Sequence, residues 1–351
     1  METILVLAHT EPGGSLDKAA LEAVAAGAAL SHELTGASLV IGLVTPDGAQ
    51  DAADSIAGCG AGRFLAVSGE AFAVPRYSTD AAAGEALARA AGATLVIAAG
   101  TSRWARCLPG VAQRLKGRAD THVTAVSIEE GSPAVTRWYY RQRIEAVSQR
   151  TERPWFMLVE PRSGKPWQGE SGTADVEPVR VDADSRLNRT KVIGLRAPRT
   201  DQQTIRPDAE VLLVAGAGWT KKQSDGQTHT ADAERLILGF LDINQASLGG
   251  SKSLVDLSGE GQPVLPFMTH LNQVGQTGST PRHAKGLATC CHGEEPHVVG
   301  WRFINDRRAI NLDANCGWAR GKADVLYIAD AFAVLEALNG LLSQRQVASQ
   351  A

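Results

Sequence analysis

Short apolar runs alternate with alanine-rich segments through the first third of the chain. Runs rich in Val, Ile and Leu predict strands at residues 4–9, 37–45, 63–68 and 93–99. Segments with small apolar residues at helical spacing predict helices at 49–57, 80–91 and 105–115. This alternation is typical of an α/β fold with a mostly parallel sheet.

A further helix is predicted directly after the first strand. Leu16, Ala20, Val24 and Ala28 recur at four-residue spacing, which places them along one face of a helix. Ser15 precedes this face and is predicted to cap the helix, because its hydroxyl can accept a hydrogen bond from a free backbone N–H of the first turn.

Beyond Asp120 the hydrophobic pattern changes to a period of two. Three further strands are predicted within residues 122–130, 134–149 and 154–161, with antiparallel pairing at the sheet edge and no helix between them. Arginines and large aromatic residues gather here and in the preceding helix: Arg103, Trp104, Arg106, Trp138, Tyr139, Tyr140, Arg141 and Arg143. Such a cluster fits either solvated strand edges or a protein interface, where Arg, Trp and Tyr commonly anchor contacts.

The composition changes between Ser163 and Asp208, where Gly, Ser, Asp, Arg and Pro dominate. We therefore predict an N-terminal α/β domain at residues 1–185, a linker at 186–208, and a second, doubly wound α/β domain ending in a helix at 209–351. In the second domain, strands are predicted at 210–214 and 253–257 and a helix at 232–242. The AGAG that follows the first of these strands allows a tight turn or a close approach to a ligand.

Composition argues against several classes of function. With 35 Lys and Arg against 38 Asp and Glu, the net charge is −3, and no basic run marks a nucleic-acid-binding surface. The five cysteines lack the CxxC spacing of a zinc site and are predicted to be buried thiols in a reducing compartment. The chain starts without a signal-peptide pattern and has no apolar run of the about 18 residues that cross a bilayer. We expect a cytoplasmic protein without membrane insertion.

Polar and glycine residues gather where strands of the second domain are expected to end. The loop Gln273–Gly278 holds two Gln, one Thr and two Gly, and Asn311 and Asp313 close a later strand-like run. Uncharged side chains of this kind bind ring edges or ribose hydroxyls, and glycines let backbone N–H groups point at phosphate oxygens. Because the carboxyl ends of parallel strands share one edge of a sheet, the pattern predicts a phosphate- and ribose-binding edge.

Three segments of the second domain carry a family resemblance. QVGQTG at 273–278, AINLD at 309–313 and ADVLYIADAFAVL at 323–335 resemble the FAD-binding domain of the electron-transfer flavoprotein alpha subunit. The specific part of the resemblance covers residues 210–335, whereas the N-terminal half agrees only in its layout and in short echoes. The resemblance implies that FAD lies along the carboxyl edge of the second domain's sheet.

The resemblance also implies roles for individual residues. At the flavin end it places Gln273 and Gln276 along the ring and ribityl chain, the Thr277 hydroxyl near N5, His297 beside O2, and Lys252, preceded by Ser251, over the ring in place of a family Arg. At the phosphates it places Gly278, His292 and Gly293; toward the adenosine it places Asn311, with Asp313 in the same motif and Asp330 in the third segment. A cation and an imidazole near the ring stabilise negative charge on reduced flavin.

The sequence departs from the family pattern at several positions. Lys252 keeps the charge of the family Arg but loses its planar guanidinium. AGAG replaces GGRG, Ser279 replaces a Lys, and Glu294-Glu295-Pro296 replaces Ala-Ile-Gln. Carboxylates at a helix N-terminus compete with a pyrophosphate for the positive end of the helix dipole, so either these side chains point away or the cofactor sits differently. The departures indicate a divergent branch of the family.

The resemblance implies one FAD in a heterodimer with a beta subunit. Electrons would come from a donor flavoprotein dehydrogenase, for example a dedicated amine or betaine demethylase, and pass to a quinone reductase or another iron–sulfur acceptor. The chain would then be an electron carrier and not an enzyme. Two alternatives stay open: a flavin-dependent oxidoreductase with its own substrate, for which Cys290 and Cys291 are the candidate redox thiols, and a structural subunit that has lost its flavin.

Overall fold

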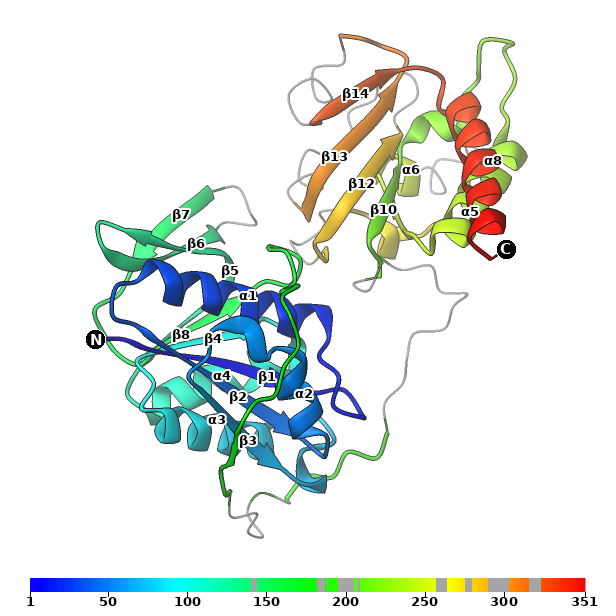
Figure 1. The fold of residues 1–351 in the computed structure, drawn as a ribbon. Coiled ribbons are helices and arrows are strands. Elements are labelled where there is room, and N and C mark those ends of the chain that lie inside the picture. Colours follow the sequence, from blue (N-terminus) through cyan, green and yellow to red (C-terminus); the bar gives the residue numbers. More distant parts are fainter. Residues whose placement is uncertain are drawn as a thin grey trace. The chain divides into compact units, whose positions relative to one another are not determined.

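The computed structural model describes residues 1–139, 144–181, 187, 189–194, 205–206, 209–256, 264–274, 280–289, 303–315 and 323–350. The chain divides into two compact units, Met1–Arg196 and Ala197–Ala351 (Figure 1). Each unit is built from a largely parallel sheet with helices packed against it, which confirms the predicted α/β class.

The first unit contains a nine-stranded sheet in the order β7-β6-β5-β8-β4-β1-β2-β3-β9. Its strands are β1 Thr3–His9, β2 Ser38–Thr45, β3 Arg63–Ser68, β4 Leu95–Ala99, β5 Arg118–Glu129, β6 Ser132–Tyr139, β7 Ile144–Gln149, β8 Trp155–Val159 and β9 Val176–Pro178. The pairs β5–β6 and β6–β7 are antiparallel, and the other neighbouring pairs are parallel. The first four strands lie close to their predicted positions.

Helices cover both faces of this sheet (Figure 1). The helices are α1 Lys18–Glu33, α2 Ala49–Ser55, α3 Tyr77–Ala91 and α4 Ser102–Arg114, with single 3₁₀ turns η1 at Ala57–Cys59 and η2 at Glu70–Phe72. In β1, Ile4 and Val6 join the core beneath α1 and α2, while Leu5 and Leu7 join the core beneath α3 and α4. Because both faces are covered, the central strands are apolar throughout.

The prediction that Ser15 caps the first helix is wrong. The N-cap is Asp17, whose Oδ1 accepts a hydrogen bond of 2.7 Å from the backbone N–H of Ala20. Ser15 lies in a tight loop just before the cap, where its carbonyl oxygen accepts from the N–H of Glu11. The predicted inward face of the helix is confirmed by the buried Ala20 and Val24.

The strands beyond Asp120 are arranged differently from the prediction. Residues 134–149 contribute to two strands of a hairpin, β6 and β7, and β8 lies between β4 and β5 instead of extending the sheet edge. β8 is a run of five buried apolar residues, WFMLV, and such a run belongs inside a sheet that is covered on both faces. The predicted antiparallel edge is confirmed by the pairing of β6 with β5 and β7.

After β8 an extended segment crosses the layer of α1 and α2, and we call its residues 160–175 the strap (Figure 1). Its backbone is fastened to that layer at several points. The N–H of Trp167 donates to the carbonyl of Leu21 at 3.0 Å, and the N–H of Gly172 donates to the carbonyl of Asp54 at 2.9 Å. The strap thus carries the chain to β9, which pairs with β3 at the other edge of the sheet.

The second unit contains a five-stranded, fully parallel sheet in the order β11-β10-β12-β13-β14. Its strands are β10 Val211–Ala215, β11 Ser247–Gly250, β12 His283–Thr289, β13 Ile304–Asn311 and β14 Val325–Ile328. Its described helices are η3 Ala217–Thr220, α5 Thr230–Asn244, α6 Lys252–Asp256, η5 His270–Asn272 and α8 Ala331–Gln350. α5 and α8 pack against one face of this sheet, where Leu236, Phe240 and Leu335 join its core (Figure 1).

The strand predicted at residues 253–257 is wrong, because the strand lies earlier, at β11, and Lys252–Asp256 forms α6. The Ser251 hydroxyl oxygen accepts a hydrogen bond of 3.2 Å from the N–H of Leu254 and so starts this helical turn. Gly249 of β11 lies against Val274, and a side chain at position 249 would collide with Val274. This close approach requires a glycine in the strand.

Candidate functional site

The strand order of the second sheet creates a switch point beside β10. The chain passes from β10 to β11 on one side and then returns to place β12 on the other side of β10. In open parallel sheets, ligands bind in the crevice outside the carboxyl ends of the strands at such a point. The carboxyl edge of this sheet is therefore the position to test against the predicted site residues.

Four of the predicted site residues follow the carboxyl ends of strands at this edge. Ser251 follows β11, Asn311 is the last residue of β13 with Asp313 just beyond it, and Asp330 follows β14. Gln273 joins them, because it forms a parallel bridge with Gly250 at the end of β11. The edge from β11 to β14 spans four strand spacings, or about 19 Å, which suits an elongated ligand.

Asn311 carries an unsatisfied donor at this edge. Its side chain is only 1 % exposed, and its Oδ1 accepts a hydrogen bond of 3.0 Å from the N–H of Asp313. Its Nδ2 is buried and makes no hydrogen bond within the part of the chain that the structure describes. A buried amide N–H without an acceptor costs about 1–3 kcal/mol, so the position is suited to a ligand that brings an acceptor oxygen or nitrogen.

Two carboxylates of this edge, Asp330 and Asp313, accept hydrogen bonds from nearby backbone N–H groups. Asp330 Oδ1 accepts a hydrogen bond of 3.0 Å from the N–H of Phe332 in the first turn of α8, and Asp313 Oδ1 accepts one of 2.8 Å from Asn315 N–H. Each of these two carboxylates has a second oxygen, Oδ2, with which it can accept a further hydrogen bond.

Six predicted site residues lie outside the described residues, namely Gln276, Thr277, Gly278, His292, Gly293 and His297. The Glu294-Glu295-Pro296 segment lies outside them as well. Lys252 is placed by its backbone in the first turn of α6, directly after Ser251 and β11. Their roles at a cofactor therefore stay predictions.

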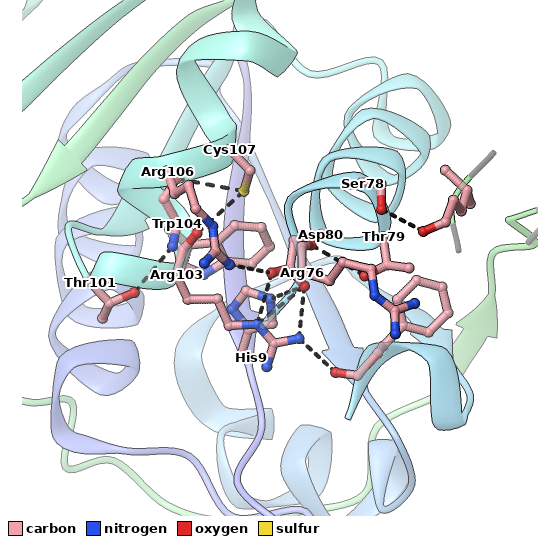
Figure 2. A network of polar contacts seen from close by, with 12 residues as sticks. His9, Arg76, Ser78, Thr79, Asp80, Thr101, Arg103, Trp104, Arg106 and Cys107 are labelled. Carbon is pink, nitrogen blue, oxygen red and sulfur yellow. Dashed lines mark hydrogen bonds and ion pairs between the residues drawn. The ribbon is translucent and has the colours of Figure 1, made fainter. Parts of the chain in front are cut away.

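A polar cluster that the sequence did not reveal lies at the carboxyl end of the first sheet. Asp80 on α3 is fully buried, and Figure 2 shows its carboxylate between His9 from the end of β1 and two arginines of α4. Arg103 donates to Asp80 Oδ1 at 2.7 Å, Arg106 approaches Oδ2 at 3.6 Å, and His9 Nε2 lies 3.4 Å from Oδ1. The cluster joins three elements that are separated in sequence.

The electrostatics of this cluster indicate a structural role. Burial alone would raise the pKa of Asp80, but His9 and Arg103 beside it hold that pKa below its usual value, so the carboxylate stays charged. Burial lowers the pKa of His9 to about 4, so its imidazole is neutral at pH 7. Arg103 also donates to the carbonyl of Phe72 at 2.6 Å, which leaves its guanidinium engaged by the protein itself.

This cluster corrects part of the surface predicted from arginine and aromatic residues. Trp104 is only 2 % exposed, and its ring stacks on His9 with centroids 3.8 Å apart and an interplanar angle of 28°. Arg103 is bound to Asp80 and so is not available as an interface anchor. α4 begins at Ser102, earlier than predicted, and this start turns both side chains toward the end of the sheet.

Of the rest of the predicted surface, Trp138 and Tyr139 lie in β6 and Arg106 lies on α4, whereas Tyr140, Arg141 and Arg143 lie outside the described residues. In β6, Arg137 contacts the buried Asp120, and Arg150, just after β7, donates to the same carboxylate. Tyr139 stays exposed, with the Arg137 guanidinium carbon 4.7 Å from its ring centroid. The two interpretations of the remaining surface, a solvated edge or a protein interface, both stay open.

A family model decides the classification of the chain. The model of the electron transfer flavoprotein domain matches residues 4–185, which is just over half of the chain. The chain belongs to the electron transfer flavoprotein domain family. A search of curated proteins finds no match.

This electron transfer flavoprotein match covers the first unit, whereas the segments predicted to bind FAD lie in the second. The family is one of electron carriers that typically bind flavin, and the match supports that general class. The matched range, residues 4–185, includes His9, Asp80 and the strands β6 and β7. It includes none of the positions predicted to touch FAD. The residues predicted to bind the cofactor belong to the second sheet and the segments beside it.

Further observations on this family member concern its helices, its metal-ligating side chains and its thiols. No helix in the described part of the chain is long and apolar enough to cross a membrane. Within the same part, no group of three or more His, Cys, Asp or Glu residues is placed to hold a metal ion. Cys59 and Cys107 are buried free thiols, and burial raises the pKa of Cys107 to about 12. Cys290 and Cys291 lie outside the described residues.

Proposed function

We propose that this chain is the FAD-binding alpha subunit of a heterodimeric electron-transfer flavoprotein. The observation that carries the proposal is Asn311. Its buried, unsatisfied Nδ2 lies at the carboxyl edge of the second sheet, in the motif that resembles the adenosine-side Asn of that family. The family match of the first unit supports the same class of protein independently.

The donors and acceptors along this edge fit a dinucleotide. Asn311, Asp313 and Asp330 cluster toward β13 and β14, and Ser251, Lys252 and Gln273 lie toward β11, so the two groups are separated by most of the about 19 Å width of the edge. A mononucleotide would reach one group only. Gly278, His292 and Gly293 are the residues proposed to hold the phosphates between them.

The chain's own residues would set the properties of the site. FAD, when bound, supplies reversible uptake and release of electrons. Lys252 and His297 would hold positive charge and a hydrogen-bond donor near the flavin, and both favour an electron-rich ring. Gln273, Gln276 and Thr277 would orient the ring, and the buried floor of the edge would exclude water from it.

The partners follow from the class of protein. We propose a beta subunit as the stable partner, a flavoprotein dehydrogenase as electron donor, and a quinone reductase or another iron–sulfur protein as acceptor. The chain would then transfer electrons in the cytoplasm without turning over a substrate of its own.

The test is to co-express the chain with its candidate beta subunit and to record the absorbance spectrum of the purified complex. We expect a yellow heterodimer with one FAD. Asn311→Ala should weaken FAD binding about tenfold or more, because the adenosine side loses a buried hydrogen bond. Asn244→Ala removes an amide of α5 that donates to the carbonyl of Phe240 in the same helix, and it should leave the FAD content unchanged. A colourless heterodimer would contradict the proposal.

A further inference from the structure

Trp219 is a buried tryptophan beside the switch point of the second unit's sheet. It lies in η3, the 3₁₀ turn that leaves β10, and its side chain is fully buried. The whole turn Ala217–Thr220 is buried with it. Because Trp219 has no exposed surface, it can influence a ligand at the carboxyl edge only through the residues that it holds in place.

The indole N–H of Trp219 takes part in a continuous chain of hydrogen bonds. Its Nε1 donates to Thr289 Oγ1 at 2.7 Å, and the Thr289 hydroxyl donates to the carbonyl of Val214 at 3.2 Å. A backbone hydrogen bond joins the same two segments, because the N–H of Gly216 donates to the carbonyl of Thr289 at 2.8 Å. Thr289 ends β12 and Val214 belongs to β10, so these bonds fasten the turn to both strands that flank the switch point.

The same indole also contacts the helix that carries Asp330. The ring centroids of Trp219 and Phe332 lie 4.5 Å apart, and Phe332 is in the first turn of α8. The N–H of Phe332 donates to Asp330 Oδ1. The position of this carboxylate is therefore tied through Phe332 to the indole and, through the indole, to β12.

Packing alone does not require this polar pair. Replacing both partners of a buried hydrogen bond by apolar groups of similar shape is nearly neutral for stability, so a Phe and a Val here would cost little beyond the volume that the smaller ring leaves empty. The hydrogen bond does, however, fix the orientation of the indole ring, because the ring has a single N–H donor and this donor points at the Thr289 hydroxyl. What it supplies is a defined position of the turn after β10.

We propose that the hydrogen bond between Trp219 and Thr289 is a positioning latch for the cofactor edge. It holds the turn after β10, the end of β12 and the start of α8 in the arrangement that binds the dinucleotide. Trp219 and Thr289 act through the residues around them, and the inference rests on the proposed function of this edge.

The experiment compares Thr289→Val with Thr289→Ser in the heterodimer. Thr289→Val keeps the shape but removes the acceptor, while Thr289→Ser keeps the hydroxyl and removes a methyl group. FAD dissociation constants are measured by flavin fluorescence, and the stability of the FAD-free complex by thermal unfolding. We expect Thr289→Val to weaken FAD binding about tenfold, the effect of one lost hydrogen bond, and Thr289→Ser to bind FAD like the wild type although it is less stable.

Two further variants keep the outcome clear if Thr289→Val folds poorly. Trp219→Phe orphans no buried donor, because the Thr289 hydroxyl still donates to Val214, and it should also weaken FAD binding about tenfold. Phe240→Leu opens the same core in α5, away from the cofactor edge, and should lower stability without changing FAD affinity.

The outcomes separate the latch from the proposed function. A wild-type heterodimer without flavin would overturn both. A yellow wild type, with FAD affinity unchanged in Trp219→Phe and Thr289→Val, would overturn the latch alone. The latch is also wrong if FAD affinity follows thermal stability across all four variants, since that result would mean that Trp219 only packs.

Discussion

Glu22 is a buried carboxylic acid of the first unit. It lies on the buried face of α1, and its Oε2 accepts a hydrogen bond of 2.5 Å from the N–H of Arg162 in the strap. Arg162 has a φ of 69°, a left-handed conformation that is unfavourable for a residue with a side chain. The carboxylate therefore holds a strained turn at the start of the strap.

This burial makes the stability of the first unit depend on pH. Burial raises the pKa of Glu22 from 4.5 to about 7, although the N–H groups of Arg162 and Gly164 and the charge of Arg162 oppose the rise, and the nearby Asp17 adds to it. A folded-state pKa above the unfolded value means that the contribution to stability is complete below pH 4.5. It is lost as the pH rises through about 7.

We predict that Glu22→Gln removes this loss. Between about pH 5.5 and about pH 8, the wild type should lose about 1 kcal/mol of unfolding free energy that the variant retains, because Gln has no proton to release. Urea unfolding of the first unit at both pH values measures the difference. An equal decline in the two proteins would show that Glu22 is not the titrating group.

At the residue scale, the sequence revealed functional candidates only where a motif is local. Asn311 could be singled out because it closes a strand within a recognisable segment. Asp80 and His9 could not, because they are far apart in sequence and each by itself is an ordinary polar residue at the end of an apolar run. Their meeting depends on the order of β1, α3 and α4 in the fold.

At the element scale, the strap depends on a glycine in the layer beneath it. Gly58, in η1, donates its N–H to the carbonyl of Glu170 at 3.2 Å. A Cβ at Gly58 would lie 2.7 Å from that same carbonyl oxygen, which is part of the backbone and has no rotamer through which to move aside. The close approach of strap and turn therefore requires a residue without a side chain.

We predict that Gly58→Ala displaces the strap. The collision should destabilise the first unit by about 1–3 kcal/mol, the usual cost of overpacking, and should speed trypsin cleavage after Arg162. Gly62→Ala is the matched control, because the nearest atom to its new Cβ would be 4.0 Å away. Limited proteolysis with mass spectrometry identifies the cut sites. Equal cleavage rates in the two variants would contradict the role given to Gly58.

The elements themselves were predictable where one pattern dominates. The apolar runs of β1 to β4 are continuous and separated by alanine-rich helices, so their positions followed from the sequence. The α6 error arose because Ser253–Leu257 is apolar enough for a strand, while the deciding feature is a cap at Ser251. The place of β8 was missed because order in a sheet depends on tertiary packing as well as on the run itself.

At the scale of the whole molecule, the two units have separate cores. The side chains that pack around the first sheet and those that pack around the second form distinct clusters. The composition of residues 163–208 indicated a crossing between domains, but which unit would match the family model could not be predicted. The motifs noticed in the sequence are short and local, whereas the model matches the pattern of a whole domain at residues 4–185.

Separate cores predict that FAD stabilises one unit selectively. A ligand that binds only the folded state adds about 2.7 kcal/mol when its free concentration is about 100 times its Kd. In the heterodimer, FAD should therefore slow hydrogen exchange by up to about a hundredfold in the second sheet, β10 to β14, and leave β1 to β4 unchanged. Asn311→Ala should reduce the slowing at the same FAD concentration, because less of the protein is then occupied. Equal protection of both sheets would show that the cofactor does not bind within the second unit alone.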